Sequence, residues 1–176
     1  FYLRKSGFRV TEKELKPAYL GLLEQIVEEQ YEQSELKKEI EKDSQDIVKE
    51  YIKRINEHNV DAIIDLMTVD HVFIDSLGIN TRGRENMRGA WDTYLTFFPD
   101  YLIKPKDFIS KNGMVAVFGT ASGTLAADGK ISDENKFEIP ASWTAVVKDG
   151  KIAKWRVYAD NEPVRKLLEK YKRPLP

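Results

Sequence analysis

The stretch from residue 114 to residue 159, MVAVFGTASGTLAADGKISDENKFEIPASWTAVVKDGKIAKWRVYA, decides the fold class. It contains three apolar runs rich in β-branched and aromatic residues, as is typical of β-strands. Each run is flanked by an Asn-Gly or Asp-Gly pair, which favours a tight hairpin turn: Asn112-Gly113, Asp128-Gly129 and Asp149-Gly150. The pattern predicts consecutive antiparallel strands at 114–126, 135–147 and 151–159, preceded by a strand at 101–109.

Helices are expected on both sides of one earlier strand. Apolar residues recur at helical spacing in the segment from 44 to 57, where Ile47, Tyr51 and Ile55 share a face. Further helices are predicted at 60–67, 84–98 and 161–171, and a strand at 71–78. Because helices come first and antiparallel strands follow, this order predicts an α+β fold with a curved sheet around helices, not a parallel βαβ design.

The N-terminal part forms a separate region. Tyr19, Leu22 and Ile26, with Leu15 before them, recur at spacings of four, three and four, so residues 12–42 should be helical with these side chains buried. A proline at position 17 suggests that the helix starts near residue 16. We expect a helical extension at 1–43 and one domain at 44–176. A helical hairpin, a long helix on the domain and a remnant of a longer protein remain open.

Composition limits the function classes. The chain has 176 residues, of which 41% are hydrophobic and 32% charged, and its formal net charge is −1. This fits a globular protein and argues against nucleic acid as the main ligand. Cysteine is absent, which excludes disulfides and thiolate catalysis, and two histidines make a metal site improbable. We expect neither metal nor cofactor.

No apolar run reaches the ~20 residues that a membrane span needs, so no membrane association is expected, and we assign the protein to the cytoplasm. The chain begins at Phe1 and not at methionine. A signal peptide, a tag or another domain is therefore expected upstream.

Three segments carry a resemblance to a known family: RINEHNVDAIIDLMTVDHVFIDSLG, GRENMRGAWDTYLTFFPDY and FEIPASWTAVVKDGKIAKWRVYADNEPV. From about Ile47 to Leu168 the chain resembles the SnoaL-like, ketosteroid-isomerase-like members of the nuclear transport factor 2 superfamily. The resemblance implies a cone-shaped domain in which a mostly antiparallel sheet curves around helices. The family includes isomerases, dehydratases, polyketide cyclases, epoxide hydrolases and pure binding modules, so the resemblance leaves the function open.

Comparison with the ketosteroid isomerases implies a set of site residues. Asp75, in FIDSLG, is at the position of their catalytic base, and Tyr51 is at the position of their oxyanion tyrosine. Trp91 replaces a pocket tyrosine, and Ser142 stands where the family has a protonated aspartate as second oxyanion donor. The loss of that acid puts steroid isomerisation itself in doubt.

The residues themselves leave alternatives. A partly desolvated Asp75 would be a usable base, but it could instead cap the end of its strand. Tyr51 should be buried, with its hydroxyl bound to a ligand or to a structural acceptor. His71 shares strand parity with Phe73 and Asp75 and is therefore an auxiliary proton carrier or a solvated residue at the strand start.

The family comparison also assigns pocket walls and an outer face. Phe73, Trp91, Phe98 and Trp155 are expected to line the pocket, together with the strand face that carries Ser142. Trp143 would then lie on the outer face of the sheet, where a second subunit could pack to form a homodimer.

Two functions fit these observations. The first is a small enzyme that performs proton transfer on a hydrophobic small molecule without a cofactor, with Asp75 as base, Tyr51 and Ser142 as donors and His71 as auxiliary. The second is a non-catalytic module that binds a small molecule or a protein partner, which the N-terminal extension favours. Several polar groups converging inside the cone would support catalysis, and a cone filled by its own side chains would oppose it.

Overall fold

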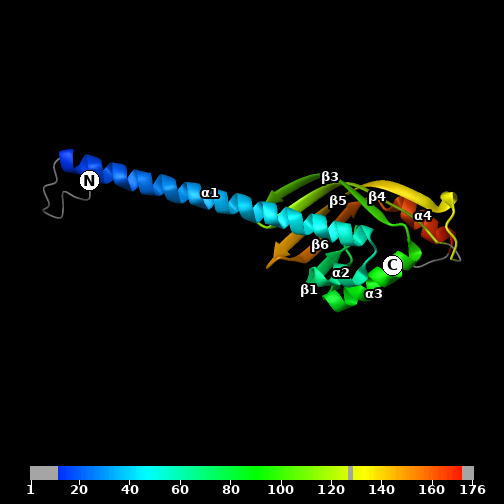
Figure 1. Cartoon of the computed structure of the whole chain (residues 1–176). Helices are drawn as coiled ribbons and strands as arrows, with labels where there is room; N and C mark the ends of the chain where they lie inside the picture. The colour runs from blue at the N-terminus through cyan, green and yellow to red at the C-terminus, as the bar shows by residue number, and fades with distance from the viewer. Residues whose placement is uncertain (1–11, 127–128, 172–176) are drawn as a thin grey trace. The chain divides into compact units, whose positions relative to one another are not determined.

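The structure is a computed structural model that describes residues 12–126 and 129–171. Two compact units divide the chain, the first ending at Glu39 and the second starting at Ile40. The helices and strands follow in this order (Figure 1): α1 Glu12–Asn56, α2 Val60–Asp65, β1 Met67–Ile74, β2 Asn80–Arg82, α3 Arg84–Phe97, β3 Leu102–Lys111, β4 Met114–Thr124, β5 Lys136–Lys148, β6 Lys151–Ala159 and α4 Glu162–Lys170, with a short 3₁₀ helix at Asp133–Asn135.

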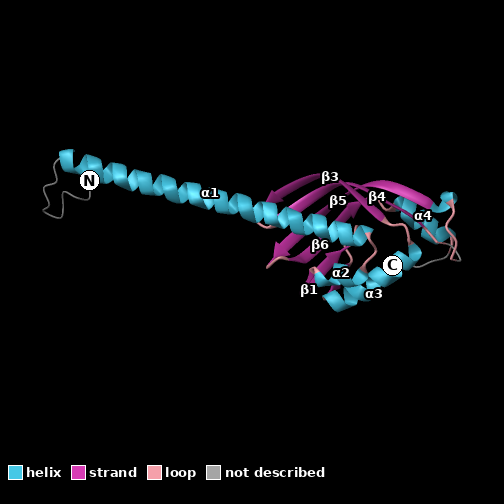
Figure 2. Ribbon diagram, viewed as in Figure 1, coloured by secondary structure: helices cyan, strands magenta, loops and turns pink. Residues whose placement is uncertain are grey.

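One six-stranded sheet organises the second unit, with strand order β2-β1-β6-β5-β4-β3. Only the β1–β6 pair is parallel among the described strands, and the other neighbours are antiparallel. Figure 2 shows the sheet curving, with α2 and α3 on the same side. This confirms the α+β prediction. The short strand β2 was not predicted, and β1 begins four residues before the expected start at residue 71.

Tight turns connect the long strands as predicted. Asn112 and Gly113 have φ values of 53° and 75°, and Asp149 and Gly150 have values of 49° and 71°. Two consecutive residues with positive φ characterise the type I′ hairpin turn, which is why Asn-Gly and Asp-Gly occur there. The third predicted turn contains Asp128, which lies outside the described residues.

A glycine permits an irregularity between β3 and β4. The register of these strands shifts between Pro105 and Asp107, and Gly119 lies opposite Pro105. A Cβ atom added at Gly119 would lie 2.1 Å from the carbonyl oxygen of Lys104. No side chain fits that space, so this position requires glycine.

The C-terminal part of α1 supplies the helical half of the core. Val48, Tyr51, Ile52 and Ile55 are buried on one face, as the helical spacing at 44–57 predicts. At the end of the helix, the amide of Asn56 bonds the backbone of Ile103: its Oδ1 accepts from the N–H and its Nδ2 donates to the C=O, both at 2.8 Å. These two bonds fix the start of β3 against α1.

The first unit consists of the N-terminal part of α1. The predicted helix is confirmed and is continuous, so it is not a hairpin. It begins at Glu12 with Pro17 inside it, earlier than expected. Tyr19, Leu22 and Ile26 are 60%, 54% and 40% exposed, so the prediction that this stripe is buried is wrong within one chain; the side chain of Leu15 lies outside those described. No described helix is both long and apolar enough to cross a membrane.

Candidate functional site

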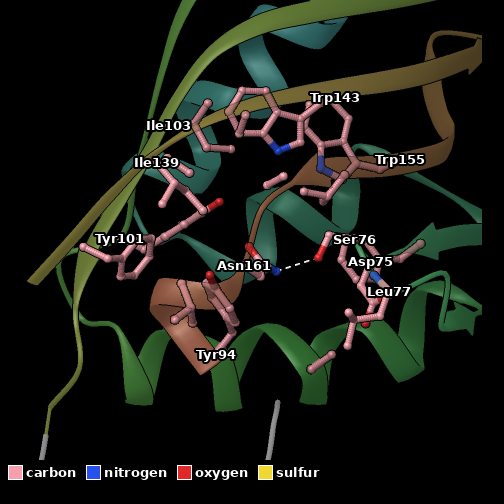
Figure 3. A pocket seen from close by; sticks show the side chains of 18 of the residues that line it. Asp75, Ser76, Leu77, Tyr94, Tyr101, Ile103, Ile139, Trp143, Trp155 and Asn161 are labelled. Carbon is pink, nitrogen blue, oxygen red and sulfur yellow. Dashed lines mark hydrogen bonds between the residues drawn. The ribbon is translucent and has the colours of Figure 1, made fainter. Parts of the chain in front are cut away.

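A cavity of about 140 Å³ lies inside the second unit, between the inner face of the sheet and α3 (Figure 3). Its walls are mostly aromatic and aliphatic. An apolar cavity of similar volume, ~150 Å³, holds one benzene molecule in another protein. The cavity therefore has room for a ligand about the size of one six-membered ring.

Asp75 lies at the rim of this cavity, directly after β1. Its Oδ1 accepts hydrogen bonds from the backbone N–H of Leu77 at 2.9 Å and of Ile79 at 2.8 Å, because the chain turns there toward β2. Its Oδ2 has no hydrogen-bond or ion-pair partner among the described residues. Asp75 therefore does cap the end of its strand, which was one of the two interpretations of the sequence. This role uses one carboxylate oxygen and leaves the other free.

The two arginines that follow Asp75 in the chain, Arg82 and Arg84, do not pair with it in the described part of the structure. Arg84 pairs with Glu85 instead, and no described cation forms a salt bridge with Asp75. In the part of the chain that the structure describes, no three His, Asp or Glu side chains are grouped as metal ligands would be.

A hydrogen bond across the rim joins two distant segments. Asn161 Nδ2 donates to Ser76 Oγ at 2.6 Å, so the residue before α4 holds the turn after β1 (Figure 3). Asn161 precedes the first turn of α4 but makes no capping bond with its side chain; the carboxylate of Asp160 accepts from the Glu162 N–H there. The Asn161 amide is thus available to the cavity rim.

Two tyrosines supply hydroxyl groups to the cavity. Tyr94 from α3 and Tyr101 from the loop before β3 meet edge to face, with ring centroids 4.9 Å apart. Burial raises the pKa of both hydroxyls far above the usual value for tyrosine. Each hydroxyl keeps its proton at neutral pH, and the two hydroxyls also interact with each other. His58 Nε2 donates to the Tyr101 carbonyl oxygen at 2.8 Å and holds the backbone that positions this ring.

The inner face of β5 carries Trp143, contrary to the expectation from the family comparison. The buried residues of this strand are Phe137, Ile139, Ala141, Trp143 and Ala145. Trp143 lines the cavity beside Trp155 of β6, and the rings stack with centroids 6.4 Å apart. The prediction that Trp143 lies on the outer face is wrong.

Ser142 lies on the opposite face and cannot donate into the cavity. It is directly opposite Tyr158 on β6 and Phe118 on β4, both of which are 43% exposed on the outer side of the sheet. Residues opposite each other on neighbouring strands share a face. The expectation that Ser142 donates to an oxyanion therefore assumed a register of β5 that was shifted by one residue.

Tyr51 is buried but does not line the cavity. Its ring packs edge to face on Trp155 at 5.2 Å, on the side away from the ligand space. Its hydroxyl has no hydrogen-bond partner of good geometry among the described residues, and the Trp91 Nε1–H lies near it. Burial raises the pKa of this hydroxyl far above its usual value.

His71 is also buried and does not line the cavity. Its Nδ1–H donates to the Ile152 carbonyl oxygen at 2.8 Å, because a carbonyl can only accept. Nε2 then carries a lone pair, is buried and has no hydrogen-bond partner in the part of the chain that the structure describes. Burial lowers the pKa of this imidazole. The structure thus separates His71 and Tyr51 from the cavity that Asp75 borders.

The aromatic residues predicted to line the cavity do so, with the exception of Phe98. Phe73, Trp91 and Trp155 line the cavity. Phe98 is fully buried behind it, where its ring packs on Tyr94 and Phe137.

Sequence reasoning missed several cavity residues. Tyr94 and Tyr101 flank the predicted wall residue Phe98, so the aromatic cluster gave a usable signal. For Trp143 the signal was the parity of Phe137 and Ile139, two large apolar residues on the same face of the strand.

The curved sheet with a cavity on its inner face defines a protein of the nuclear transport factor 2-like fold. A family model described as the SnoaL-like domain matches residues 48–155. This match spans more than half of the chain, so the chain belongs to the SnoaL-like domain family. A comparison with curated protein sequences finds no match.

Solved structures of SnoaL-like proteins share the fold at low sequence identity. A candidate SnoaL-like polyketide cyclase from Shewanella denitrificans is 16% identical over 72% of this chain and 97% of its own, with a TM-score of 0.63. IdmH, a candidate polyketide cyclase from Streptomyces antibioticus, is 22% identical over 72% and 98%, with a TM-score of 0.59. SalBIII, an epoxide hydrolase/cyclase-like enzyme of pyran ring formation in the polyether salinomycin, is 24% identical over 68% and 92%, with a TM-score of 0.60. These likenesses establish the fold.

Proposed function

We propose that this protein is an enzyme that transfers a proton within a small hydrophobic molecule, with Asp75 as the base and without a cofactor. The observation that carries the proposal is the carboxylate at the cavity rim. Backbone amides hold its Oδ1, while its Oδ2 is free of partners within the described residues. A base that is held at one oxygen and open at the other is oriented before the substrate arrives, which favours proton transfer.

The chemistry follows from this arrangement. Oδ2 of Asp75 takes a proton from the carbon next to a substrate carbonyl, and the electron pair of that C–H bond moves to the carbonyl oxygen. If the substrate is a β,γ-unsaturated ketone, the resulting dienolate takes the proton back from Asp75 at the γ-carbon, which isomerises the substrate. If it carries a β-hydroxyl group, that group leaves as water with the Asp75 proton, and if a second carbonyl is in reach, the enolate carbon attacks it and the new alkoxide takes the proton. Hydrogen-bond donors in the cavity stabilise the oxygen as charge develops on it.

The alternative is a module of the same fold that binds without catalysis. The cavity favours the enzyme, because it is open and polar groups converge on it: the hydroxyls of Tyr94 and Tyr101, the Asn161–Ser76 pair and the Asp75 carboxylate. A pure binding pocket has no use for a free carboxylate oxygen that backbone amides hold in a fixed orientation at the cavity rim.

The substitution Asp75→Asn tests the proposal, since it keeps the shape and removes the base. Turnover on a panel of enolisable ketones and epoxides should fall by on the order of 10² or more. The enzyme proposal fails if turnover is unchanged, and the binding module is favoured if the wild type converts no compound of the panel.

We propose further that the chain is a homodimer held by α1. The exposed stripe on α1 comprises Tyr19, Leu22, Ile26, Leu36 and Ile40, which all fit positions a and d of one heptad repeat. A second copy is the partner that fits this stripe, because the stripe is complementary to itself in an antiparallel pair. Leu22 then lies opposite Ile40 of the second copy, and Ile26 lies opposite its Leu36.

The polar residues inside the stripe favour the antiparallel arrangement. Glu29 and Gln33 occupy the central d and a positions of the same repeat. In a parallel pair each Glu29 would meet the other Glu29, and the two like charges would repel. In the antiparallel pair Glu29 meets Gln33, whose amide can donate to the carboxylate.

A further inference from the structure

We propose that the indole N–H groups of Trp143 and Trp155 together bind the carbonyl oxygen of the ligand, and that the ligand is a ketone with one flat ring. This inference deepens the proposed function and rests on it, because it names the donors and the substrate class of the same cavity.

The sheet places the two indoles side by side. Trp143 on β5 lies opposite Val157, and Trp155 on β6 lies opposite Ala145, so the tryptophans are diagonal neighbours on the inner face. Their ring planes are 23° from parallel, with centroids 6.4 Å apart. Figure 3 shows both indole nitrogens turned toward the same open space in the cavity. One acceptor atom in that space can therefore address both donors.

Neither N–H has a partner in the described part of the protein, although both side chains are only 1% exposed. Trp91 differs, because its Nε1–H is buried and lies near the Tyr51 hydroxyl, away from the pair formed by Trp143 and Trp155. A buried donor without an acceptor costs free energy, which a ligand atom can recover when it accepts the hydrogen bond. Both N–H groups can therefore donate a hydrogen bond to a ligand.

The chemistry of the donors selects the ligand atom. An indole N–H only donates and carries no charge, so its partner must be an acceptor such as a carbonyl or enolate oxygen. An ammonium group would be left unpaired at this place. Two neutral donors also strengthen their bonds as negative charge develops on the oxygen, as removal of a proton by Asp75 requires.

The size and walls of the cavity select the rest of the ligand. A volume of about 140 Å³ accommodates one six-membered ring with a short substituent. Ile103, Ile139 and the ring of Tyr101 border the space and carry no charge, and the charged residues of the lining are Asp75 and Arg165. Aryl ketones and cyclic enones of one ring meet all of these conditions.

A pair of matched probes tests the inference by binding alone. Acetophenone and α-methylstyrene have nearly the same shape, but only acetophenone has an acceptor oxygen. Their dissociation constants are measured by titration calorimetry for the wild type, for Trp143→Phe, for Trp155→Phe and for the double variant. Phenylalanine keeps an aromatic wall and removes the N–H. A ¹³C=O label in acetophenone reports the hydrogen bond directly through the infrared stretch of the bound carbonyl.

Each substitution should weaken acetophenone by about three- to tenfold relative to α-methylstyrene, as expected for one hydrogen bond. The carbonyl stretch should move back toward its value in an apolar solvent. The inference is overturned if both probes change by the same factor, if the stretch does not move, or if the wild type binds neither probe at millimolar concentration. Asp75→Asn should leave the preference for acetophenone over α-methylstyrene intact. The binding test can therefore succeed even if Asp75 is not the base. Asp75 can likewise be the base even if the two tryptophans do not bind the carbonyl.

Discussion

Asn161 donates a 2.6 Å hydrogen bond to the hydroxyl oxygen of Ser76, and this bond closes the cavity rim between residues 85 positions apart in the sequence. The contact links the last helix to the turn that carries Asp75. The position of the Asp75 carboxylate therefore depends on Asn161, which precedes the last helix of the chain.

The rim bond can be measured by a double-mutant cycle. Ser76→Ala and Asn161→Ala should each lower the free energy of unfolding by about 1 kcal/mol, because each leaves one polar partner unpaired. The double variant should lose less than the sum of the two, with a coupling of about 0.5–1.5 kcal/mol in urea unfolding. Additive losses would mean that the two side chains do not interact.

Gly119 gives a sharper test of the sheet. Gly119→Ala places a Cβ atom against the Lys104 carbonyl, so the backbones of β3 and β4 must separate. We expect a loss of about 2 kcal/mol or more in the free energy of unfolding. Gly89→Ala is the control, because its added Cβ, in the middle of α3, meets no atom within 4 Å apart from its own helical backbone and chain neighbours. It should be neutral or stabilising by up to ~1 kcal/mol; equal effects at both positions would contradict the strand geometry.

His71 makes stability depend on pH. Burial lowers the pKa of the folded imidazole below the ~6.5 of an unfolded chain, and the hydrogen bond to Ile152 and the nearby Asp70 only partly offset this. As the pH falls below about 6.5 the unfolded chain binds a proton that the folded chain does not, so stability decreases until the lower folded pKa is reached. Above pH 6.5 this contribution to the pH dependence vanishes.

The measurement compares the wild type with His71→Asn, whose amide keeps a donor near the Ile152 carbonyl. The difference in the free energy of unfolding between the two proteins should change between pH 7 and pH 5, by at most about 1.4 kcal/mol per pH unit. A difference that is constant over this range would show that His71 titrates alike in both states.

The antiparallel dimer is tested on α1. Leu22→Glu should shift the protein from dimer to monomer in sedimentation equilibrium, since it places a charge in the apolar stripe. Ser34→Glu adds the same charge outside the stripe and should leave the dimer intact. The chain has no cysteine, so a mixture of Glu29→Cys and Gln33→Cys should form a disulfide that neither variant forms alone. A monomeric wild type, or crosslinking of Gln33→Cys with itself, would refute the arrangement.

Much of the fold was predictable because its signals are local. The Asn-Gly and Asp-Gly turns and the spacing of Val48, Tyr51 and Ile55 act within a few residues, and the corresponding hairpins and helix are in the structure. The short strand β2 escaped prediction, because three residues, two of them exposed, carry no periodic pattern.

The site was less predictable because its geometry depends on register and on distant contacts. The predicted register of β5 was shifted by one residue. It placed Ser142 on the inner face instead of Trp143, because neighbouring residues of a strand face opposite sides. The burial of Tyr51 was foreseen from helical spacing, but its position behind Trp155 depends on how helix and sheet pack. The pairing of Asn161 with Ser76 has no sequence signal at all.

The most direct test of the central proposal is hydrogen exchange on a one-ring ketone in deuterated water, followed by NMR. If Asp75 is the base, the wild type should accelerate exchange of the α-hydrogens of acetophenone or cyclohexenone, and Asp75→Asn should lower that rate by on the order of 10² or more while binding the same ketone. Equal exchange rates for the wild type and Asp75→Asn, or no acceleration by a wild type that binds the ketone, would contradict the account.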